Sequence, residues 1–178
     1  MTTKKSKLLL DKHIAKIPNV PKKGITFYDI SPILESPKLL KQTIDALCEE
    51  ATVFKPDLIC GIDARGFLFA TPLAYNLSCG VIMIRKSNKL PGKVHVQSYE
   101  LEYGSSELSI QTERQLSGKR ILVIDDLIAT GGTLNASQAL IKKASGIICG
   151  ALCIIELTEL KGSEKLMCPI VSLQTYRF

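Results

Sequence analysis

A series of short apolar runs, separated by segments with helical periodicity, constrains the fold of this chain more than any other feature. The runs DLICGID (57–63), VIMIR (81–85) and RILVID (120–125) have apolar centres and are too short for typical helices, which indicates strands buried on both faces. Helical patterns follow the first and third runs, and IICGALCIIEL (147–157) predicts a further strand. This alternation predicts an α/β fold with a central, mainly parallel sheet flanked by helices.

Other elements are expected around this framework. Leucines 8–10, Ile14 and Ile17 predict an N-terminal helix that Pro18 and Pro21 bring to an end. Ser36 followed by Pro37 predicts the cap and first residue of a second helix. The remaining predictions are a helix at GFLFATPLAYNL, a helix at GTLNASQALIKKA, a short helical piece at KGSEKL and a last strand at PIVSLQTY.

Residues 94–112 follow a different pattern. VHVQSYELEY alternates apolar and polar residues, and Gly104 with two serines separates it from ELSIQ. Such alternation around a turn predicts a half-exposed β-hairpin, placed as a flap beside the buried strands.

Composition limits the class of protein without selecting one function. A chain of 178 residues with 46% apolar residues fits one domain with a sizeable core. The net charge of +6 suits a nucleic-acid binder, an enzyme acting on a polyanion, or a merely soluble basic surface. The six cysteines form no Cys-x-x-Cys pair, so we expect reduced packing residues rather than a metal site.

We expect neither a signal peptide nor a membrane span in this sequence. The start MTTKKSKLLLDKH has only three consecutive leucines before charge returns, which is short for a signal-peptide core. The longest apolar run, GIICGALCII, is about half the length that a membrane span needs. We therefore expect a cytoplasmic protein.

The strongest chemical signal is VIDDLIATGGTL (123–134), in which two adjacent acids precede a glycine-rich turn. The strand-to-helix order places this turn at the carboxyl edge of a parallel sheet, where ligands bind in such folds. There the backbone N–H groups of 129–133, the threonine hydroxyls and the helix dipole are suited to a phosphate. The residues expected to hold it are Ala129, Thr130, Gly131, Gly132 and Thr133.

The adjacent acids Asp125 and Asp126 then need a partner other than the phosphate. Carboxylates are good acceptors for sugar hydroxyls. A ribose 5-phosphate satisfies both halves of the motif, because its phosphate docks in the turn while its 2- and 3-hydroxyls face the acids. The turn lacks the ending of a nucleotide P-loop and the spacing of a dinucleotide fingerprint.

This combination resembles the phosphoribosyl pyrophosphate motif of the type I phosphoribosyltransferases. Four further segments extend the resemblance over nearly the whole chain and are similar to those of the adenine phosphoribosyltransferases. These segments are GITFYDISP (24–32), GIDARGFLFA (61–70), RKSNKLPG with SYELEYG (85–92 and 98–104), and ELTELKGSEKL (156–166).

The resemblance implies a pyrophosphate site after the first buried strand. It consists of Asp63, Ala64 and Arg65, with Arg85 and Lys89 contacting the leaving group. A guanidinium and neighbouring backbone N–H groups are suited to such an anion. The family also carries a non-proline cis peptide at this turn, which would lie between Asp63 and Ala64.

The resemblance further implies a base site. Phe27 and Leu127 would sandwich adenine, while backbone groups near Thr26 and Tyr28 would bind its ring edge. Adenine presents a donor beside an acceptor where hypoxanthine presents the opposite pattern, so a rigid backbone pair distinguishes them. Tyr28 departs from the arginine of some relatives, which affects expected side-chain contacts more than base choice.

The resemblance implies one phosphoribosyltransferase domain over residues 1–178, with a base-binding hood at about 1–35 and a flap at about 86–112. The flap would close over the site and exclude water from a cation-like ribosyl group. Catalysis would involve Arg65, Lys89, Glu102 and Tyr103, with either Glu102 or water receiving the proton of the base. A homodimer is also implied.

The expected reaction is Mg²⁺-dependent transfer of phosphoribosyl from phosphoribosyl pyrophosphate to N9 of adenine, giving AMP and pyrophosphate in purine salvage. Mg²⁺ would be held mainly by the substrate rather than by a protein cage. We expect no nucleic-acid or membrane partner. Two alternatives are a nucleic-acid-binding regulator that senses ribosyl phosphate, and an enzyme of the same fold that uses guanine or hypoxanthine.

Overall fold

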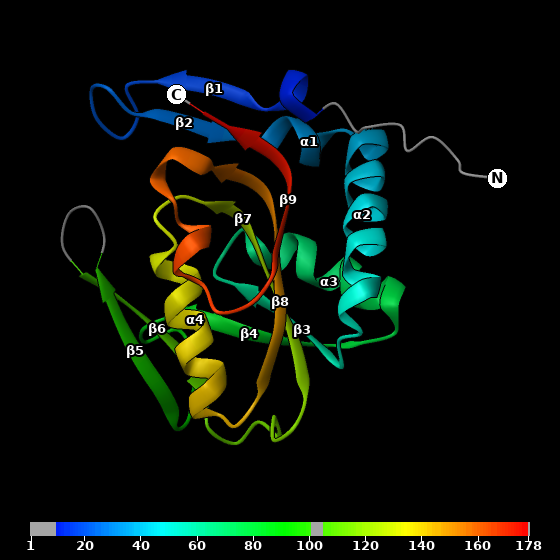
Figure 1. Ribbon diagram of the computed structural model, residues 1–178, viewed down its shortest axis with the longest axis vertical. Helices are drawn as coiled ribbons and strands as arrows, with labels where there is room; N and C mark the ends of the chain where they lie inside the picture. Colours follow the sequence, from blue (N-terminus) through cyan, green and yellow to red (C-terminus); the bar gives the residue numbers. More distant parts are fainter. Residues whose placement is uncertain (1–9, 101–104, 178) are drawn as a thin grey trace.

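The computed structural model describes residues 10–100 and 105–177 (Figure 1). A seven-stranded sheet with the order β5-β6-β4-β3-β7-β8-β9 forms its centre. Strands β4, β3, β7, β8 and β9 run parallel, while β5 and β6 form an antiparallel hairpin against β4. The strands are β3 (Leu58–Ile62), β4 (Gly80–Lys86), β5 (Val94–Glu100), β6 (Ser105–Gln111), β7 (Arg120–Ile128), β8 (Ile147–Leu157) and β9 (Ile170–Tyr176).

Helices cover both faces of this sheet, which confirms the predicted α/β fold. The helices are α1 (Ser31–Glu35), α2 (Pro37–Ala51), α3 (Gly66–Leu77) and α4 (Gly132–Lys143). Alternate residues of β7 enter different cores: Leu122 and Ile124 pack with α2 and α3, whereas Ile121 and Val123 pack with α4. Burial on both faces explains why these strands are apolar runs in the sequence.

A separate two-stranded antiparallel ribbon lies at the end of the sheet where β7 and β8 end (Figure 1). It consists of β1 (Ala15–Pro18) and β2 (Thr26–Asp29). Single-turn 3₁₀ helices complete the described elements: η1 (Leu10–His13), η2 (Thr52–Phe54), η3 (Thr158–Leu160) and η4 (Ser163–Lys165).

The predicted N-terminal helix is wrong over the described residues. Leu10–His13 is a 3₁₀ turn and Ala15–Pro18 is a strand, in which Ile17 pairs with Phe27. Cross-strand pairing with β2 outweighs the local helical spacing of the apolar residues, and Leu10 still enters the core. Leucines 8 and 9 lie outside the described residues.

Strand β7 is longer than predicted. We expected it to end at the acid pair, but Leu127 and Ile128 continue the parallel ladder with Ile155 and Glu156 of β8. The two acids therefore belong to a hydrogen-bonded strand and not to the turn that follows it.

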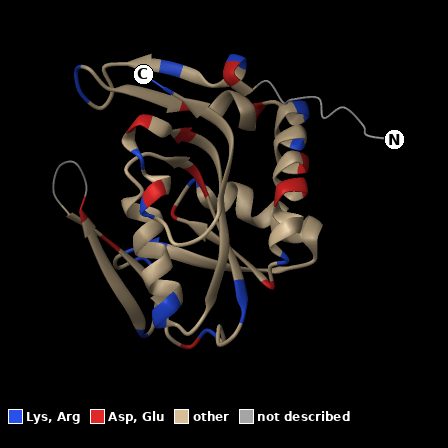
Figure 2. Ribbon diagram, in the orientation of Figure 1, with Lys and Arg blue, Asp and Glu red and all other residues tan. Residues whose placement is uncertain are grey.

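Lys and Arg residues are interspersed with Asp and Glu residues along the described chain (Figure 2). On α2, for example, Lys41 and Asp45 form an exposed ion pair of 2.6 Å one helical turn apart. No helix among the described residues is long and apolar enough to span a membrane.

The cap of α2 provides a test of the local folding rules. The Ser36 hydroxyl accepts a hydrogen bond of 3.4 Å from the Leu39 N–H, as the Ser-Pro signal predicts. We expect Ser36→Ala to lower the free energy of unfolding by about 1 kcal/mol, because a helix N–H loses its partner. Ser36→Asp, which keeps an acceptor, should retain wild-type stability in urea unfolding. Equal stability of Ser36→Ala and the wild type would contradict this assignment.

Candidate functional site

A cavity of about 510 Å³ opens at the carboxyl ends of β3 and β7, the edge of a parallel sheet at which ligands bind. The turn after β3, the acid pair of β7, the glycine-rich turn and the start of α4 surround it. Its lining residues are Asp63, Ala64, Arg65, Lys86, Tyr99, Leu108, Asp125, Asp126, Leu127, Ile128, Ala129, Thr130, Gly131, Gly132, Thr133 and Leu134.

The acid pair forms the floor of this cavity. Asp126 is only 4% exposed, whereas Asp125 keeps partial exposure. The Asp126 N–H donates a hydrogen bond of 2.9 Å to Asp125 Oδ1. Gly66 allows α3 to begin directly against Asp125, because a Cβ at Gly66 would lie 2.6 Å from the carbonyl oxygen of Ile124.

Burial shifts the titration of both acids in the same direction. Desolvation, followed by the charge of Asp126, raises the pKa of Asp125 well above its usual value. Desolvation also raises the pKa of Asp126, and the Arg65 guanidinium opposes this shift. The site therefore holds two carboxyl groups whose charged forms are unfavourable until a ligand or cation compensates them.

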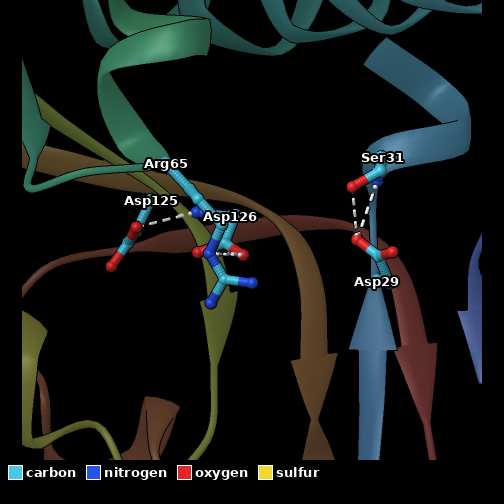
Figure 3. A network of polar contacts seen from close by, with 5 residues as sticks. All are labelled: Asp29, Ser31, Arg65, Asp125 and Asp126. Carbon is cyan, nitrogen blue, oxygen red and sulfur yellow. Dashed lines mark hydrogen bonds and ion pairs between the residues drawn. The ribbon is translucent and has the colours of Figure 1, made fainter. Parts of the chain in front are cut away.

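The Arg65 guanidinium places a positive charge beside Asp126 and so partly offsets the desolvation of its carboxylate (Figure 3). The Arg65 Nε lies 3.0 Å from Asp126 Oδ2, and its guanidinium carbon lies 5.5 Å from the centre of the Phe27 ring. The neighbouring Asp29 carboxylate does not join this pair. It accepts hydrogen bonds from the Ser31 N–H and hydroxyl, which lower the pKa of Asp29 and hold the end of β2 at the start of α1.

The turn at 129–133 presents the start of a 12-residue helix to the cavity. Gly131 has φ +80°, a conformation that favours glycine. No side chain caps the first turn of α4. Its leading N–H groups are therefore suited to an anion, which the positive end of the helix dipole also favours.

The Asp63–Ala64 peptide is cis, as expected. Arg85 lies beside this turn: its Nε donates a hydrogen bond of 3.1 Å to Asp63 Oδ2, and its Nη1 donates one of 3.1 Å to the Lys89 carbonyl. Arg85 and Lys89 do not line the cavity.

A second, mainly apolar cavity of about 580 Å³ adjoins the first and lies under the β1–β2 ribbon. The two cavities share Arg65, Leu127 and Ala129. The lining residues of the second cavity are Val20, Pro21, Lys22, Gly24, Ile25, Thr26, Phe27, Tyr28, Arg65, Leu127, Ala129, Leu157 and Leu160. An aromatic ring facing aliphatic side chains in such a cavity is suited to a flat, largely apolar ring.

The Tyr28 side chain packs against the C-terminal strand. It is 8% exposed and stacks on Tyr176 with ring centroids 4.4 Å apart. The Lys16 ammonium lies 4.7 Å from the centre of the same Tyr176 ring. Tyr28 thus fixes the β1–β2 ribbon to β9.

The structure brings most of the predicted site residues together. The predicted ribose-phosphate residues and Asp63 to Arg65 line the first cavity, while the predicted base residues line the second. Glu102 and Tyr103 lie outside the described residues. Sequence reasoning assigned no site role to Lys86, Tyr99, Leu157 and Leu160, although all four belong to motifs that it had singled out.

The described residues contain no group of three or more His, Cys, Asp or Glu side chains that could form a metal cage. The cavity does offer the carboxylates of Asp125 and Asp126. This donor set fits a divalent cation that takes most of its ligands from a bound substrate and water.

A family model, curated relatives and solved structures all match this chain over most of its length. Residues 30–167 match the Phosphoribosyl transferase domain family. The adenine phosphoribosyltransferase of Gluconobacter oxydans is 47% identical over 94% of this chain and 93% of its own length. The crystal structure of the enzyme of that name from Thermoanaerobacter pseudethanolicus matches with a TM-score of 0.91 and 42% identity, over 94% of this chain and 98% of that one.

A third match carries ligands. The adenine phosphoribosyltransferase of Saccharomyces cerevisiae, solved with an imino-altritol bisphosphate and adenine, has a TM-score of 0.89 and 36% identity. The match covers 92% of this chain and 96% of that one.

The raised pKa of Asp125 predicts a stabilising substitution. The folded state holds the Asp125 proton more tightly than the unfolded state, so its contribution to stability falls as pH rises through the folded-state pKa. Asp125→Asn, which is neutral at every pH and keeps an acceptor for the Asp126 N–H, should therefore raise the free energy of unfolding at pH 8 by about 1 kcal/mol. Below the unfolded pKa, near 3.8, the gain should vanish.

Urea unfolding of the ligand-free protein at several pH values measures this effect. Asp45→Asn on the exposed face of α2 is the matched control, with a change of at most about 0.5 kcal/mol expected. If the wild type were more stable than Asp125→Asn at pH 8, desolvation would not be the main effect of Asp125 on the free energy of unfolding.

Proposed function

The chain belongs to the adenine phosphoribosyltransferase family, and from this premise we propose that it transfers 5-phosphoribosyl from phosphoribosyl pyrophosphate to N9 of adenine. The products are AMP and pyrophosphate, and the role is purine salvage. The observation that carries this proposal is the junction of the two cavities at Arg65 and Leu127. A flat ring in the apolar cavity and a phosphorylated sugar in the polar one would meet there.

The sugar end of the substrate follows from the glycine-rich turn. The uncapped N–H groups at the start of α4 and the hydroxyls of Thr130 and Thr133 hold the 5-phosphate. Asp125 and Asp126 accept hydrogen bonds from the ribose hydroxyls. Hydroxyl donors also stabilise the charged carboxylates, which desolvation disfavours in the free chain.

Arg65 couples the two halves of the site. In the free chain it pairs with Asp126. To contact pyrophosphate, the guanidinium releases this carboxylate, which then becomes available to the ribose hydroxyls. Asp63 and Ala64 complete the pyrophosphate site, to which Arg85 and Lys89 add positive charge on closure of the flap.

The base end is the apolar cavity. Adenine stacks between Phe27 and Leu127, and the backbone near Thr26 and Tyr28 binds its ring edge. The Tyr28–Tyr176 stack holds this backbone in place. A rigid donor and acceptor pair favours adenine over hypoxanthine, because the wrong base leaves polar groups unpaired.

The β5–β6 hairpin acts as the flap. Tyr99 already lines the first cavity, and a Cβ at Gly132 would lie 3.2 Å from the Glu100 carbonyl oxygen. The flap sequence also carries Glu102 and Tyr103, which lie outside the described residues, and either Glu102 or water takes the proton of the base. A closed site also keeps water from a cation-like ribosyl group.

A bound Mg²⁺ would neutralise charge on the pyrophosphate leaving group. Within the first cavity, Asp125 and Asp126 would offer it carboxylate oxygens. These carboxylates orient the sugar whether they reach the cation directly or through water.

A regulator that binds nucleic acid is the less favoured alternative. It would need a concentrated basic surface, whereas basic and acidic residues are interspersed along the described chain in Figure 2. We also propose a cytoplasmic location, which the six free cysteines suit because a reducing compartment keeps thiols unpaired.

We propose that the protein forms a homodimer through a face that α3 and β4 share. Leu68 and Tyr75 project from the exposed side of α3, and Tyr75 is 85% exposed. Val81 and Met83 of β4 are exposed on the same side of the sheet, because they pair in register with Ile59 and Gly61, which lie under α3. Large apolar side chains gathered on one face are typical of a protein–protein contact.

Base choice is tested by one incubation with Mg²⁺, phosphoribosyl pyrophosphate and equimolar adenine, hypoxanthine and guanine. We expect AMP as the only major nucleotide, and no product when a chelator removes Mg²⁺. IMP or GMP as the main product would overturn the base assignment, and ligand binding without any nucleotide would favour the sensor.

The dimer is tested by sedimentation velocity. Tyr75→Asp should convert a wild-type dimer to a monomer, because a carboxylate would be buried without a partner in the contact. Val53→Asp, which changes an exposed apolar residue of η2 rather than of α3 or β4, should leave the dimer intact. A monomeric wild type, or a dimeric Tyr75→Asp variant, would refute the proposed face.

A further inference from the structure

The segment from Thr158 to Leu166 belongs to a sequence motif from which the site described so far uses only Leu157 and Leu160, as walls of the apolar cavity. It follows β8 as two single-turn 3₁₀ helices, η3 and η4, joined at Lys161 and Gly162. Leu160 lines the apolar cavity, and the Met167 N–H donates a hydrogen bond of 3.2 Å to Gln138 of α4. The segment is thus tied to the helix that begins at the glycine-rich turn.

Gly162 touches that turn through its backbone. A Cβ at Gly162 would lie 2.1 Å from the Ala129 carbonyl oxygen and 2.7 Å from the Gly131 nitrogen. The contact is mutual, because a Cβ at Gly131 would lie 2.3 Å from the Gly162 carbonyl oxygen. These distances are below any normal van der Waals separation, so two backbones meet here with no room for a side chain on either.

The backbone conformation of Gly162 does not itself need glycine. Its φ of −63° and ψ of −35° lie in the right-handed helical region, which every residue adopts. Gly131 differs, since its φ of +80° favours glycine for conformation as well as for space. The absence of a side chain at Gly162 is therefore explained by the contact with the turn alone.

We propose that Gly162 is a positioning residue for the phosphate turn. It supports Ala129 and Gly131 from behind and so holds the backbone N–H groups of the turn in the geometry that grips the 5-phosphate of the ribosyl substrate. Preorganised donors bind an anion tightly because no rearrangement is needed on binding. This inference rests on the proposed function, because it assigns the anion in the turn to a phosphoribosyl compound.

Gly162→Ala tests the inference without backbone strain. The added methyl group must push the turn away, so we expect affinity for ribose 5-phosphate, measured by calorimetry, to fall about tenfold or more. In steady-state assays the KM for phosphoribosyl pyrophosphate should rise by a similar factor, while the KM for adenine stays within about twofold of wild type. The melting temperature should change by only a few degrees.

Gly118→Ala is the matched control. Gly118 has φ +69° and nothing within 4 Å of a Cβ, so alanine there adds backbone strain without touching the turn. We expect this variant to bind ribose 5-phosphate like the wild type, even though its backbone is the more strained of the two.

The outcomes separate the inference from the proposed function. Wild-type affinity of Gly162→Ala for ribose 5-phosphate would overturn the positioning role. An equal rise in the KM values for both substrates, together with a large fall in melting temperature, would also overturn it. A wild-type protein that binds no ribose 5-phosphate would overturn the proposed function, and this inference with it. Loss of phosphate affinity in Gly162→Ala alone supports it.

Discussion

The cost of holding two adjacent carboxylates in a buried strand organises this structure. Asp125 and Asp126 are hydrogen-bonded members of β7, where desolvation disfavours their charged forms. The turn before α3 bears directly on that cost. Arg65 reaches Asp126 from the turn before α3, and Gly66 lets α3 start against Asp125. The site is electrostatically incomplete in the free chain, which favours a ligand that brings hydroxyl donors and a cation.

The sheet could be predicted from sequence because its strands are buried on both faces. Apolar runs such as those of β3 and β7 have no other stable place in a chain of this size. The N-terminal region could not be predicted in this way. Leu10, Ile14 and Ile17 have helical spacing, but their partners are β2 and the main core, which lie elsewhere in the chain. Only tertiary pairing decides between strand and helix for so short a segment.

Some site residues can likewise be identified from local sequence, whereas others are identified only by tertiary contacts. The acid pair and the glycine-rich turn are contiguous, so one stretch of sequence was enough to predict a site for a phosphorylated sugar. Leu157 ends β8 and Leu160 ends η3; both are ordinary apolar residues that line a cavity together with residues of the β1–β2 ribbon. Tyr28 shows the converse: it lies in a motif for base binding, yet its ring serves to fix the ribbon to Tyr176. Spacing identifies such positions but does not give the direction of a side chain.

The contact between Gly131 and Gly162 extends this distinction from side chains to backbone. A glycine in a turn is expected to supply an unusual conformation, and Gly131 does so. Gly162 has a helical conformation, and only the neighbouring backbone at 2.1 Å from its missing Cβ explains it. Two segments about thirty residues apart therefore constrain one another through atoms that every residue has. Precision in an anion site built from backbone N–H groups depends on such packing, because side-chain rotamers cannot adjust the donors.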